Sequence, residues 1–166
     1  MSLVYVDTSV VVAALDPLDP RRDGARRALQ RPVGKIVSEL VSAELASVLS
    51  RQRGVLEEVR RRLGVDESVA FVAVLLYILK RFGLRYVPVK KFSRTLLGRF
   101  YGPIAYSILL SEKLRLRTLD LLHLAYIKAL REQGIPVDTL LTADTDFKEN
   151  EERIRNVLGI TVELIK

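Results

Sequence analysis

The sequence predicts an α/β fold, a three-layer α/β/α sandwich around a central parallel sheet. Two observations predict it. Short apolar segments rich in β-branched residues alternate with longer helical segments, as expected of strands that are buried on both faces. The chain also has 166 residues, 49% of them hydrophobic, so one domain of ordinary size can bury a core. Because no repeat or low-complexity linker interrupts the pattern, we expect a single domain over residues 1–166.

The N-terminal part of the chain alternates between strand and helix. A β-branched apolar run predicts a buried strand at residues 3–6, and residues 10–15 predict a short helix. Turn residues follow, in which Asp19 can cap a helix that has Pro20 at its first position and extends to about Leu29. A brief strand is expected at residues 35–37.

The middle of the chain is predicted to be mostly helical. Ser38 caps a helix that extends to about Gln52, and glycines at positions 54 and 64 bound the next one. Residues 67–82 form a helix whose centre, 69–79, is almost entirely apolar. This helix is either buried at the centre of the molecule or part of a subunit interface. A strand at 84–89 follows.

The C-terminal part begins with a long helical region at residues 93–114, with a kink or break at Gly102-Pro103. A helix is expected from Thr118 to Gln133, and strands are expected at 140–142 and 160–165. Residues from about 54 to 115 therefore form an enlarged helical stretch of the domain.

The composition excludes several kinds of site. There is no cysteine, so neither a disulfide framework nor a thiolate metal site can form, and a single histidine excludes a histidine-built zinc site. A bound metal would be held mainly by oxygen, which favours Mg²⁺ or Mn²⁺. The longest apolar run is too short to span a bilayer, and the N-terminus lacks the features of a signal peptide. We therefore expect a cytoplasmic protein without a membrane segment.

The formal net charge is +7, and arginine is the more frequent of the basic residues. A basic surface attracts phosphate groups or an anionic membrane, although a basic soluble protein without such a partner explains the charge equally well.

Four acidic residues are predicted to meet at one edge of the sheet. Asp7 and Asp144 each come just after a strand, and ligands of parallel sheets bind at the carboxyl ends of the strands. Asp120 lies in the first turn of its helix, and Glu44 falls on an apolar stripe, where a carboxylate needs a partner. Converging carboxylates repel one another, and a divalent cation removes that repulsion while it orients a phosphate and activates water.

Each of these residues also has an ordinary structural explanation. Asp7 can cap the following helix, and Asp120 can interact with the dipole of its own helix. Asp144 and Asp146 can be turn residues, and Glu44 can pair with an arginine. Taken singly, these explanations are the more frequent ones, so the functional prediction depends on all four acids acting together.

Four segments, in order along the chain, resemble motifs of the PIN-domain family, particularly its toxin-like, VapC-type branch. They are VYVDTSVVVAAL (residues 4–15), VSELVSAELASVL (37–49), LRTLDLLHLA (116–125) and LLTADTDF (140–147). Each motif alone is weak, but four in the same order and approximate spacing make a specific signal. The stretch at 54–115 is longer and more apolar than in a minimal toxin of this branch.

The resemblance implies a compact α/β/α fold, Mg²⁺ or Mn²⁺ dependence and endoribonuclease activity on RNA. Homodimers and neutralisation by a small antitoxin protein are typical of the toxin branch. The resemblance also implies that Thr8 or Ser9 supports the site and that Asp146 is an additional metal ligand. It assigns the catalytic and metal-binding roles to four residues: Asp7, Glu44, Asp120 and Asp144.

Three further residues lie near Asp120 in the sequence. His123 follows it by three positions, and the family commonly has a histidine there, so packing or a local hydrogen bond is the better explanation than a general base. Arg115 and Arg117 lie just before Asp120, where a cation can meet the scissile phosphate of RNA. Glu39 begins its helix and is interpreted as a dipole partner.

The sequence therefore predicts a metal-dependent endoribonuclease that hydrolyses RNA phosphodiester bonds, with the toxin of a toxin–antitoxin pair as one possible role. A catalytically idle RNA- or antitoxin-binding module on the same fold is the alternative, and the four retained carboxylates argue against it. A phosphohydrolase with Asp7 as covalent nucleophile ranks last, because that chemistry usually needs a second aspartate at the position that Ser9 occupies.

Overall fold

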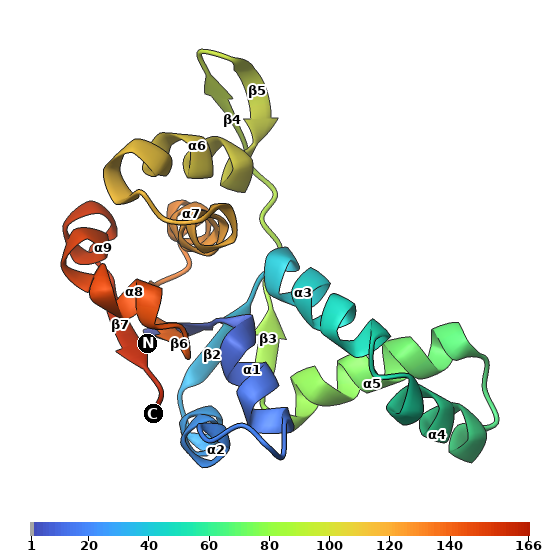
Figure 1. Ribbon diagram of the computed structural model, residues 1–166. Helices are drawn as coiled ribbons and strands as arrows, with labels where there is room; N and C mark the ends of the chain where they lie inside the picture. The colour runs from blue at the N-terminus through green and yellow to red at the C-terminus, as the bar shows by residue number, and fades with distance from the viewer. Residues whose placement is uncertain (1) are drawn as a thin grey trace.

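A five-stranded parallel sheet forms the centre of the molecule in the computed structural model, which describes residues 2–166 (Figure 1). The strand order is β3-β2-β1-β6-β7, and every neighbouring pair is parallel. The strands are β1 (Leu3–Val6), β2 (Gly34–Val37), β3 (Leu84–Tyr86), β6 (Val137–Thr142) and β7 (Thr161–Leu164). The prediction of an α/β/α sandwich with a parallel sheet is confirmed.

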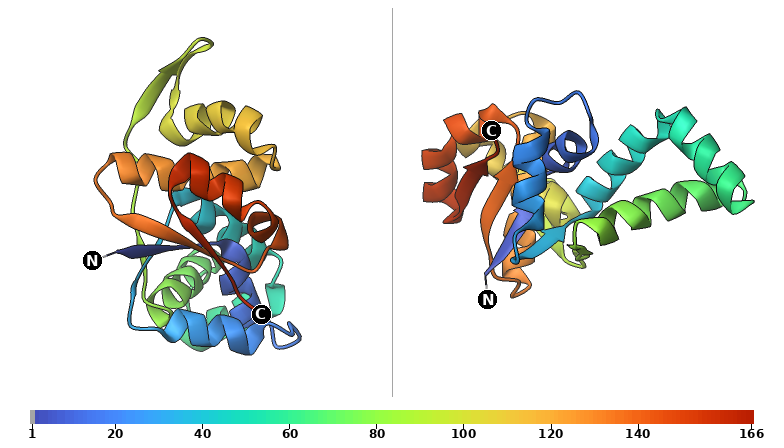
Figure 2. Two further views of the ribbon diagram at one scale, coloured as in Figure 1. Left: turned by 90° about the vertical axis from the view of Figure 1, so that its left-hand side faces the viewer. Right: turned by 90° about the horizontal axis from the view of Figure 1, so that it is seen from below.

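Helices cover both faces of the sheet (Figure 2). The connections between β1, β2 and β3 lie on one face, and those leading to β6 and β7 lie on the other, as right-handed crossovers require. On the first face are α1 (Thr8–Leu15), α2 (Arg22–Gln30), α3 (Glu39–Ser50) and α5 (Glu67–Arg81), while α4 (Arg53–Leu63) packs on α5 away from the sheet. On the second are α6 (Gly102–Leu114), α7 (Thr118–Glu132), α8 (Thr145–Glu149) and α9 (Glu151–Leu158).

The register of β1 against β6 sets the position of the acidic residues that follow these strands. Val6 lies opposite Leu141, and the amide of Asp7 donates a 2.9 Å hydrogen bond to the carbonyl of Leu141. Side chains just beyond the two strands therefore meet at the same edge of the sheet, as the sequence predicted from parallel pairing.

The predicted helix at residues 93–114 is wrong over residues 93–101. Residues 92–101 form an antiparallel hairpin of β4 (Phe92–Thr95) and β5 (Gly98–Tyr101), and α6 begins only at Gly102. Gly98 has a φ of 132°, which a helix does not permit. Pro103 lies in the first turn of α6, where it needs no amide donor, so the predicted discontinuity at Gly102-Pro103 is a break at which the helix begins and not a kink within it.

Helix α5 is not the buried central helix that its apolar sequence allowed. Its outer face is exposed at Val69, Val72, Leu76 and Tyr77, and the side chain of Leu76 is 59% accessible. Helices α4 and α5 project together from the sheet (Figure 1). Of the two predictions for residues 69–79, burial at the centre of the molecule is therefore wrong, and a subunit interface remains a prediction. Among residues 2–166, no helix has the length and apolar character needed to cross a membrane.

Candidate functional site

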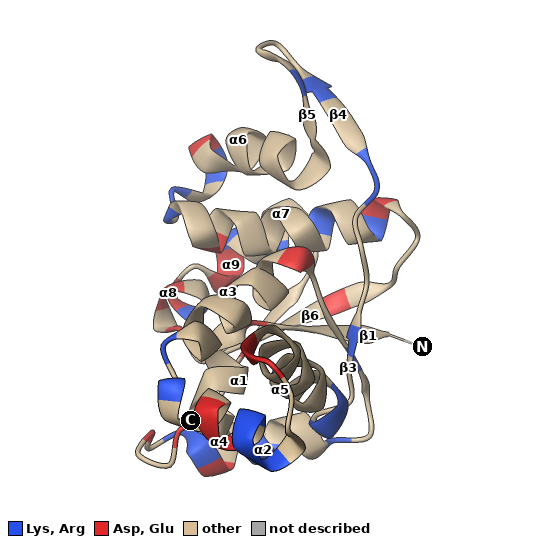
Figure 3. Ribbon diagram, turned by 90° about the vertical axis from the view of Figure 1, so that its right-hand side faces the viewer, with Lys and Arg blue, Asp and Glu red and all other residues tan. Residues whose placement is uncertain are grey.

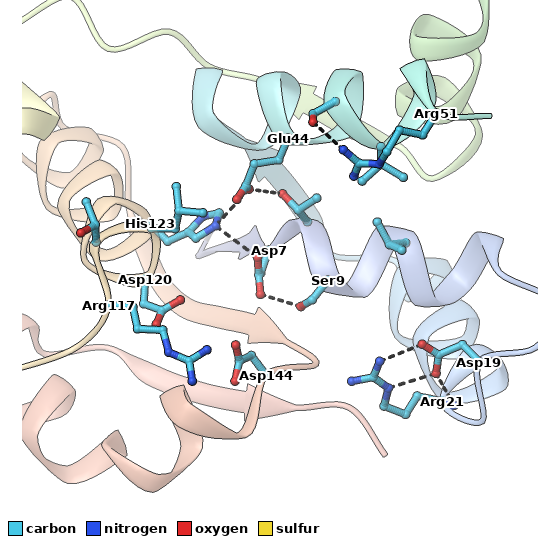
Figure 4. A pocket seen from close by; sticks show the side chains of 16 residues that line it. Asp7, Ser9, Asp19, Arg21, Glu44, Arg51, Arg117, Asp120, His123 and Asp144 are labelled. Carbon is cyan, nitrogen blue, oxygen red and sulfur yellow. Dashed lines mark hydrogen bonds and ion pairs between the residues drawn. The ribbon is translucent and has the colours of Figure 1, made fainter. Parts of the chain in front are cut away.

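The four predicted acidic residues line one cleft of about 710 Å³ at the carboxyl edge of the sheet (Figure 4). They come from separate elements: Asp7 follows β1, Asp144 follows β6, Glu44 lies in α3, and Asp120 lies in the first turn of α7. The fold thus brings together side chains that are up to 137 positions apart in the sequence.

Asp7 is buried and held by hydroxyl groups. Its Oδ2 atom accepts hydrogen bonds from Ser9 Oγ at 2.5 Å and from Thr142 Oγ1 at 2.7 Å. Thr142 Oγ1 in turn accepts the amide N–H of Asp144 at 3.0 Å, and Ser9 Oγ accepts that of Ala143. The hydrogen bonds that hold the Asp7 carboxylate therefore also connect the segment after β1 to the segment after β6. The Asp7 side chain does not cap α1.

Glu44 faces the cleft from α3 and is bound by Thr8 and His123. Thr8 Oγ1 donates to Glu44 Oε2, and His123 Nε2 lies 3.2 Å from the same oxygen and 3.3 Å from Asp7 Oδ1. Although burial raises the pKa of the Glu44 carboxyl, the His123 and Thr8 hydrogen bonds and the His123 charge outweigh it, so the pKa is lowered. Glu44 is therefore ionised at neutral pH, and its partner is a histidine, not an arginine.

His123 is more central to the site than the sequence indicated. It is 3% exposed, and its Nδ1 lies 3.1 Å from the hydroxyl of Tyr5, which also contacts Ser38 Oγ at 2.7 Å. Burial lowers the pKa of His123, but the hydrogen bond to Glu44 and the nearby carboxylates outweigh it and raise the pKa. The local hydrogen bond predicted for this residue is present, and its partners are the acidic residues themselves.

Asp7, Glu44 and His123 each offer a ligand atom, and these atoms lie within 4.8 Å of one another. Such spacing suits a shared cation, because oxygen and imidazole nitrogen are both ligands of divalent metals. Asp120 and Asp144 do not belong to this tight group, and they face it from other sides of the same cleft (Figure 4).

Asp120 carries the clearest sign of a missing partner. It is 9% exposed, and its Oδ2 atom has no hydrogen-bond partner among residues 2–166. Burial raises the pKa of the Asp120 carboxyl, and the negative charges of Asp144 and Asp146 raise it further, against the opposing effect of His123. An unpartnered carboxylate oxygen that faces other carboxylates is what a divalent cation would satisfy, so these residues fit a metal ion.

The outer acids have additional structural roles. Asp144 caps α8, since its Oδ1 accepts the amide N–H of Asp146 at 2.9 Å. Asp144 therefore has an ordinary structural role, as a helix cap where the sequence suggested a turn residue, and this role does not compete with a place in the cleft. Asp146 does not line the cleft directly, and its Oδ2 lies 3.5 Å from Arg117 Nη2.

Three arginines surround the acidic residues: Arg21, Arg51 and Arg117. Of the two that the sequence singled out, Arg117 lines the cleft and Arg115 does not. Arg21 was not anticipated. Its guanidinium donates to both carboxylate oxygens of Asp19, at 3.0 and 2.7 Å, and to the carbonyl of Ala143 at 2.8 Å. The prediction that Asp19 caps a helix starting at Pro20 is wrong, because α2 begins at Arg22 and Asp19 holds Arg21 instead.

A family model described as "PIN domain" matches residues 4–152 of the chain. No curated protein matches the chain by sequence. Its fold is similar to that of VapBC2 from Rickettsia felis bound to a promoter DNA fragment, with 16% identity, 99% of both chains covered and a TM-score of 0.57. It is also similar to VapC20 from Mycobacterium tuberculosis, described as a sarcin-ricin loop cleaving toxin, with 21% identity, 88% of this chain and 93% of that chain covered, and a TM-score of 0.51. FitAcB from Neisseria gonorrhoeae gives 14% identity, 96% and 95% coverage, and a TM-score of 0.55.

Proposed function

The chain belongs to the PIN domain family, and from that premise we propose that it is a metal-dependent endoribonuclease that hydrolyses RNA phosphodiester bonds. One observation carries the proposal: four carboxylates from separate elements converge in one cleft that arginines surround. Such an arrangement costs stability through mutual repulsion and has no value for packing, whereas it is suited to binding a cation and a phosphate together.

Asp7, Glu44, Asp120 and Asp144 would hold Mg²⁺ or Mn²⁺. Asp146 lies outside the cleft lining beside Arg117, so it would contribute as an additional ligand through water. Such an ion activates water, orients the phosphate and stabilises the developing negative charge on the departing oxygen. Thr8, Ser9 and Thr142 fix the carboxylates by hydrogen bonds, and His123 sets the relative positions of Asp7 and Glu44. Support of this kind typically matters as much as the ligands do.

The arginines of the cleft are suited to bind the phosphates of the substrate. Arg21 is held rigidly by Asp19 and Ala143, so little side-chain freedom is lost when it meets an anion. Arg117 is largely exposed at the rim, where it can reach a phosphate next to the one that is cleaved. In the proposed reaction, water adds to phosphorus as the P–O3′ bond breaks, and a proton from the water ends on the departing oxygen, so that one product carries a 5′-phosphate and the other a 3′-hydroxyl.

Hydrolysis with activated water needs no 2′-hydroxyl, so the chemistry of the cleft does not distinguish RNA from DNA. The choice of RNA as substrate therefore depends on the family. The likeness to a toxin described as cleaving the sarcin-ricin loop supports RNA over DNA. We further propose that the protein is the toxin of a toxin–antitoxin pair that acts in the cytoplasm. The similarity to structures of toxin–antitoxin complexes supports a small antitoxin protein as partner.

The alternative is an RNA- or antitoxin-binding module without catalysis. The unpartnered Oδ2 of Asp120 disfavours it, because a module that binds no metal gains nothing from a buried carboxylate without a partner.

The test is incubation of the purified chain with a pool of cellular RNA, with and without Mn²⁺, followed by sequencing of the new 5′ ends. The wild type should generate ends only with Mn²⁺. Asp7→Asn should abolish them, and Asp23→Asn, an exposed acid on α2, should leave them unchanged. Cleavage that is independent of Mn²⁺, or that survives in Asp7→Asn, would contradict the proposal.

A further inference from the structure

The β4–β5 hairpin is a second surface with marked chemistry. It projects beyond α6 (Figure 1), and none of its residues lines the cleft. One of its faces packs on the helix, where Ser93 Oγ donates to the Tyr106 hydroxyl at 3.2 Å. The other face is exposed and presents Phe92, Arg94 and Arg99, with Leu96 and Leu97 at the tip.

The segment that contains the hairpin is positively charged throughout. Residues 84–111 include five lysines and arginines and no aspartate or glutamate. Among residues 2–166, Lys91 has a partner in Glu132, whereas Arg94 and Arg99 form no ion pair. Figure 3 shows this basic colouring on the two strands without acidic residues between them. The hairpin therefore offers two guanidinium groups that have no acidic partner among residues 2–166 and that lie outside the lining of the acidic cleft.

The position of the two arginines costs the isolated protein stability. Arg94 and Arg99 are paired directly across the hairpin, and like charges in that position repel. A two-stranded ribbon is only marginally stable, so a repulsive pair within it is unfavourable unless a partner supplies negative charge. The two leucines at the tip also expose apolar surface where turn residues are usually polar.

The same groups match the chemistry of an unpaired RNA strand. Guanidinium groups bind phosphates, and aromatic and arginine planes stack on bases that are not paired. The Arg99 guanidinium already lies over the Phe92 ring, 5.1 Å from its centroid, so a flat surface with positive charge is in place. An anionic membrane or an acidic protein would also offset the arginine repulsion, but RNA is favoured because it is the proposed substrate of the cleft in the same chain and because its unpaired bases suit the aromatic ring beside the charges.

We infer that the β4–β5 hairpin is an arm that binds single-stranded segments of RNA outside the cleavage cleft. The inference rests on the proposed function, in which RNA is the substrate. Arg94 and Arg99 contact neighbouring phosphates, while Phe92 and the tip leucines pack against bases. The arm thereby selects RNA that has an unpaired segment outside the cleft, such as the loop of a stem-loop, over fragments that only fill the cleft.

The test is binding of a fluorescent stem-loop RNA in EDTA, measured by anisotropy at several salt concentrations in the Asp7→Asn background. Arg94→Ser with Arg99→Ser should weaken binding about tenfold and reduce the slope of log K against log salt by about 1.4, two single-strand phosphate contacts. The matched control is Arg27→Ser with Arg153→Ser, two exposed arginines on α2 and α9 that remove the same charge and form no ion pair within residues 2–166. Equal losses in both pairs would overturn the inference.

Cleavage by the otherwise wild-type protein separates this inference from the proposed function. The hairpin variant should raise KM for the stem-loop and leave the rate on a fragment that fills only the cleft unchanged. If RNA binds through the hairpin but is never cleaved, the proposed nuclease activity is contradicted, whereas the inference that the hairpin binds RNA is supported. Unchanged RNA affinity, with lost self-association or lost binding to anionic vesicles, would assign the hairpin to a protein or lipid and overturn the inference.

Discussion

Asp7 illustrates how single residues build the site. Its carboxylate is bound on one oxygen by Ser9 and Thr142 and faces His123 with the other. These groups come from α1, β6 and α7, so the carboxylate position depends on three elements. Hydroxyl groups that fix one carboxylate oxygen in this way leave the other directed at the cleft, as a metal ligand requires.

Thr142→Val tests this support without a change in side-chain shape. Thr142 is fully buried, and loss of its hydroxyl removes one of the two hydrogen bonds to Asp7 Oδ2 and the hydrogen bond that the Asp144 amide donates. We expect Mn²⁺ affinity to fall about tenfold or more, and the free energy of unfolding to fall by about 1–3 kcal/mol. Calorimetric Mn²⁺ titration and urea unfolding measure both. Thr139→Val on the same strand is the control, and equal Mn²⁺ affinity in the two variants would disprove the role.

The residues that sequence could predict differ from those it could not. Asp7 and Asp144 were predictable because each follows an apolar run, and parallel strands end at one edge. The roles of Thr142 and Arg21 were not predictable, because nothing in the neighbouring sequence distinguishes a threonine in a strand or an arginine in a turn as part of a site. Their roles arise from contacts with Asp7, 135 positions away, and with the carbonyl of Ala143, 122 positions away.

At the scale of elements, Glu132 joins the base of the hairpin to the domain. It lies at the end of α7 and accepts hydrogen bonds from Lys91 at 2.6 Å and from the Tyr106 hydroxyl of α6. Lys128 lies 3.1 Å from its other oxygen. Burial raises the pKa of Glu132, but the hydrogen bonds from Lys91, Tyr106 and Lys128 outweigh it and lower the pKa to about 2.

Glu132→Gln should therefore destabilise the protein in a pH-dependent way. A lowered carboxyl pKa stabilises the fold above the ordinary value of 4.5, and this stability is lost as pH falls toward about 2. We expect the variant to be about 1 kcal/mol less stable at pH 7, after allowance for the partial exposure of the side chain. Urea unfolding at pH 7, 4.5 and 3 should show that the difference in unfolding free energy between wild type and variant becomes smaller below pH 4.5. A difference in unfolding free energy that is the same at all three pH values would contradict this account.

The hairpin marks the limit of prediction at this scale. Periodicity located the strands of the sheet and most of the helices, because burial on a sheet face imposes regular patterns. The turn at Leu96-Leu97 has none of the residues typical of hairpin turns, so residues 93–101 read as helix. Contacts with Glu132 and Tyr106, which lie outside the hairpin, stabilise these strands, and local propensity does not reveal such contacts.

At the scale of the whole molecule, strand order explains why the acids meet. β1 lies at the centre of the sheet, between β2 and β6, so the residues after it contact segments from both halves of the chain. Helix α3 then supplies Glu44 from one face, and α7 supplies Asp120 and His123 from the other. The site exists only in the folded chain, and no contiguous motif could form it.

The exposed face of α5 predicts self-association. An apolar surface on this projecting helix is formed by Val69, Val72, Leu76 and Tyr77. Such surfaces usually mark contacts between proteins. We expect a homodimer in which this face meets a second copy of the chain. Light scattering after gel filtration should give twice the monomer mass, and Leu76→Glu should give the monomer mass. A wild type that stays monomeric at high concentration would refute the dimer.

The central claim is that carboxylates from distant elements form one divalent-cation site. Calorimetric titration with Mn²⁺ tests it most directly, with the wild type compared with Asp7→Asn, Asp120→Asn and Asp144→Asn, and with Asp23→Asn as the control. We predict saturable Mn²⁺ binding by the wild type and by Asp23→Asn, and binding weakened about tenfold or more in each of the other variants. Absence of binding, or equal affinity in all five proteins, would contradict the claim.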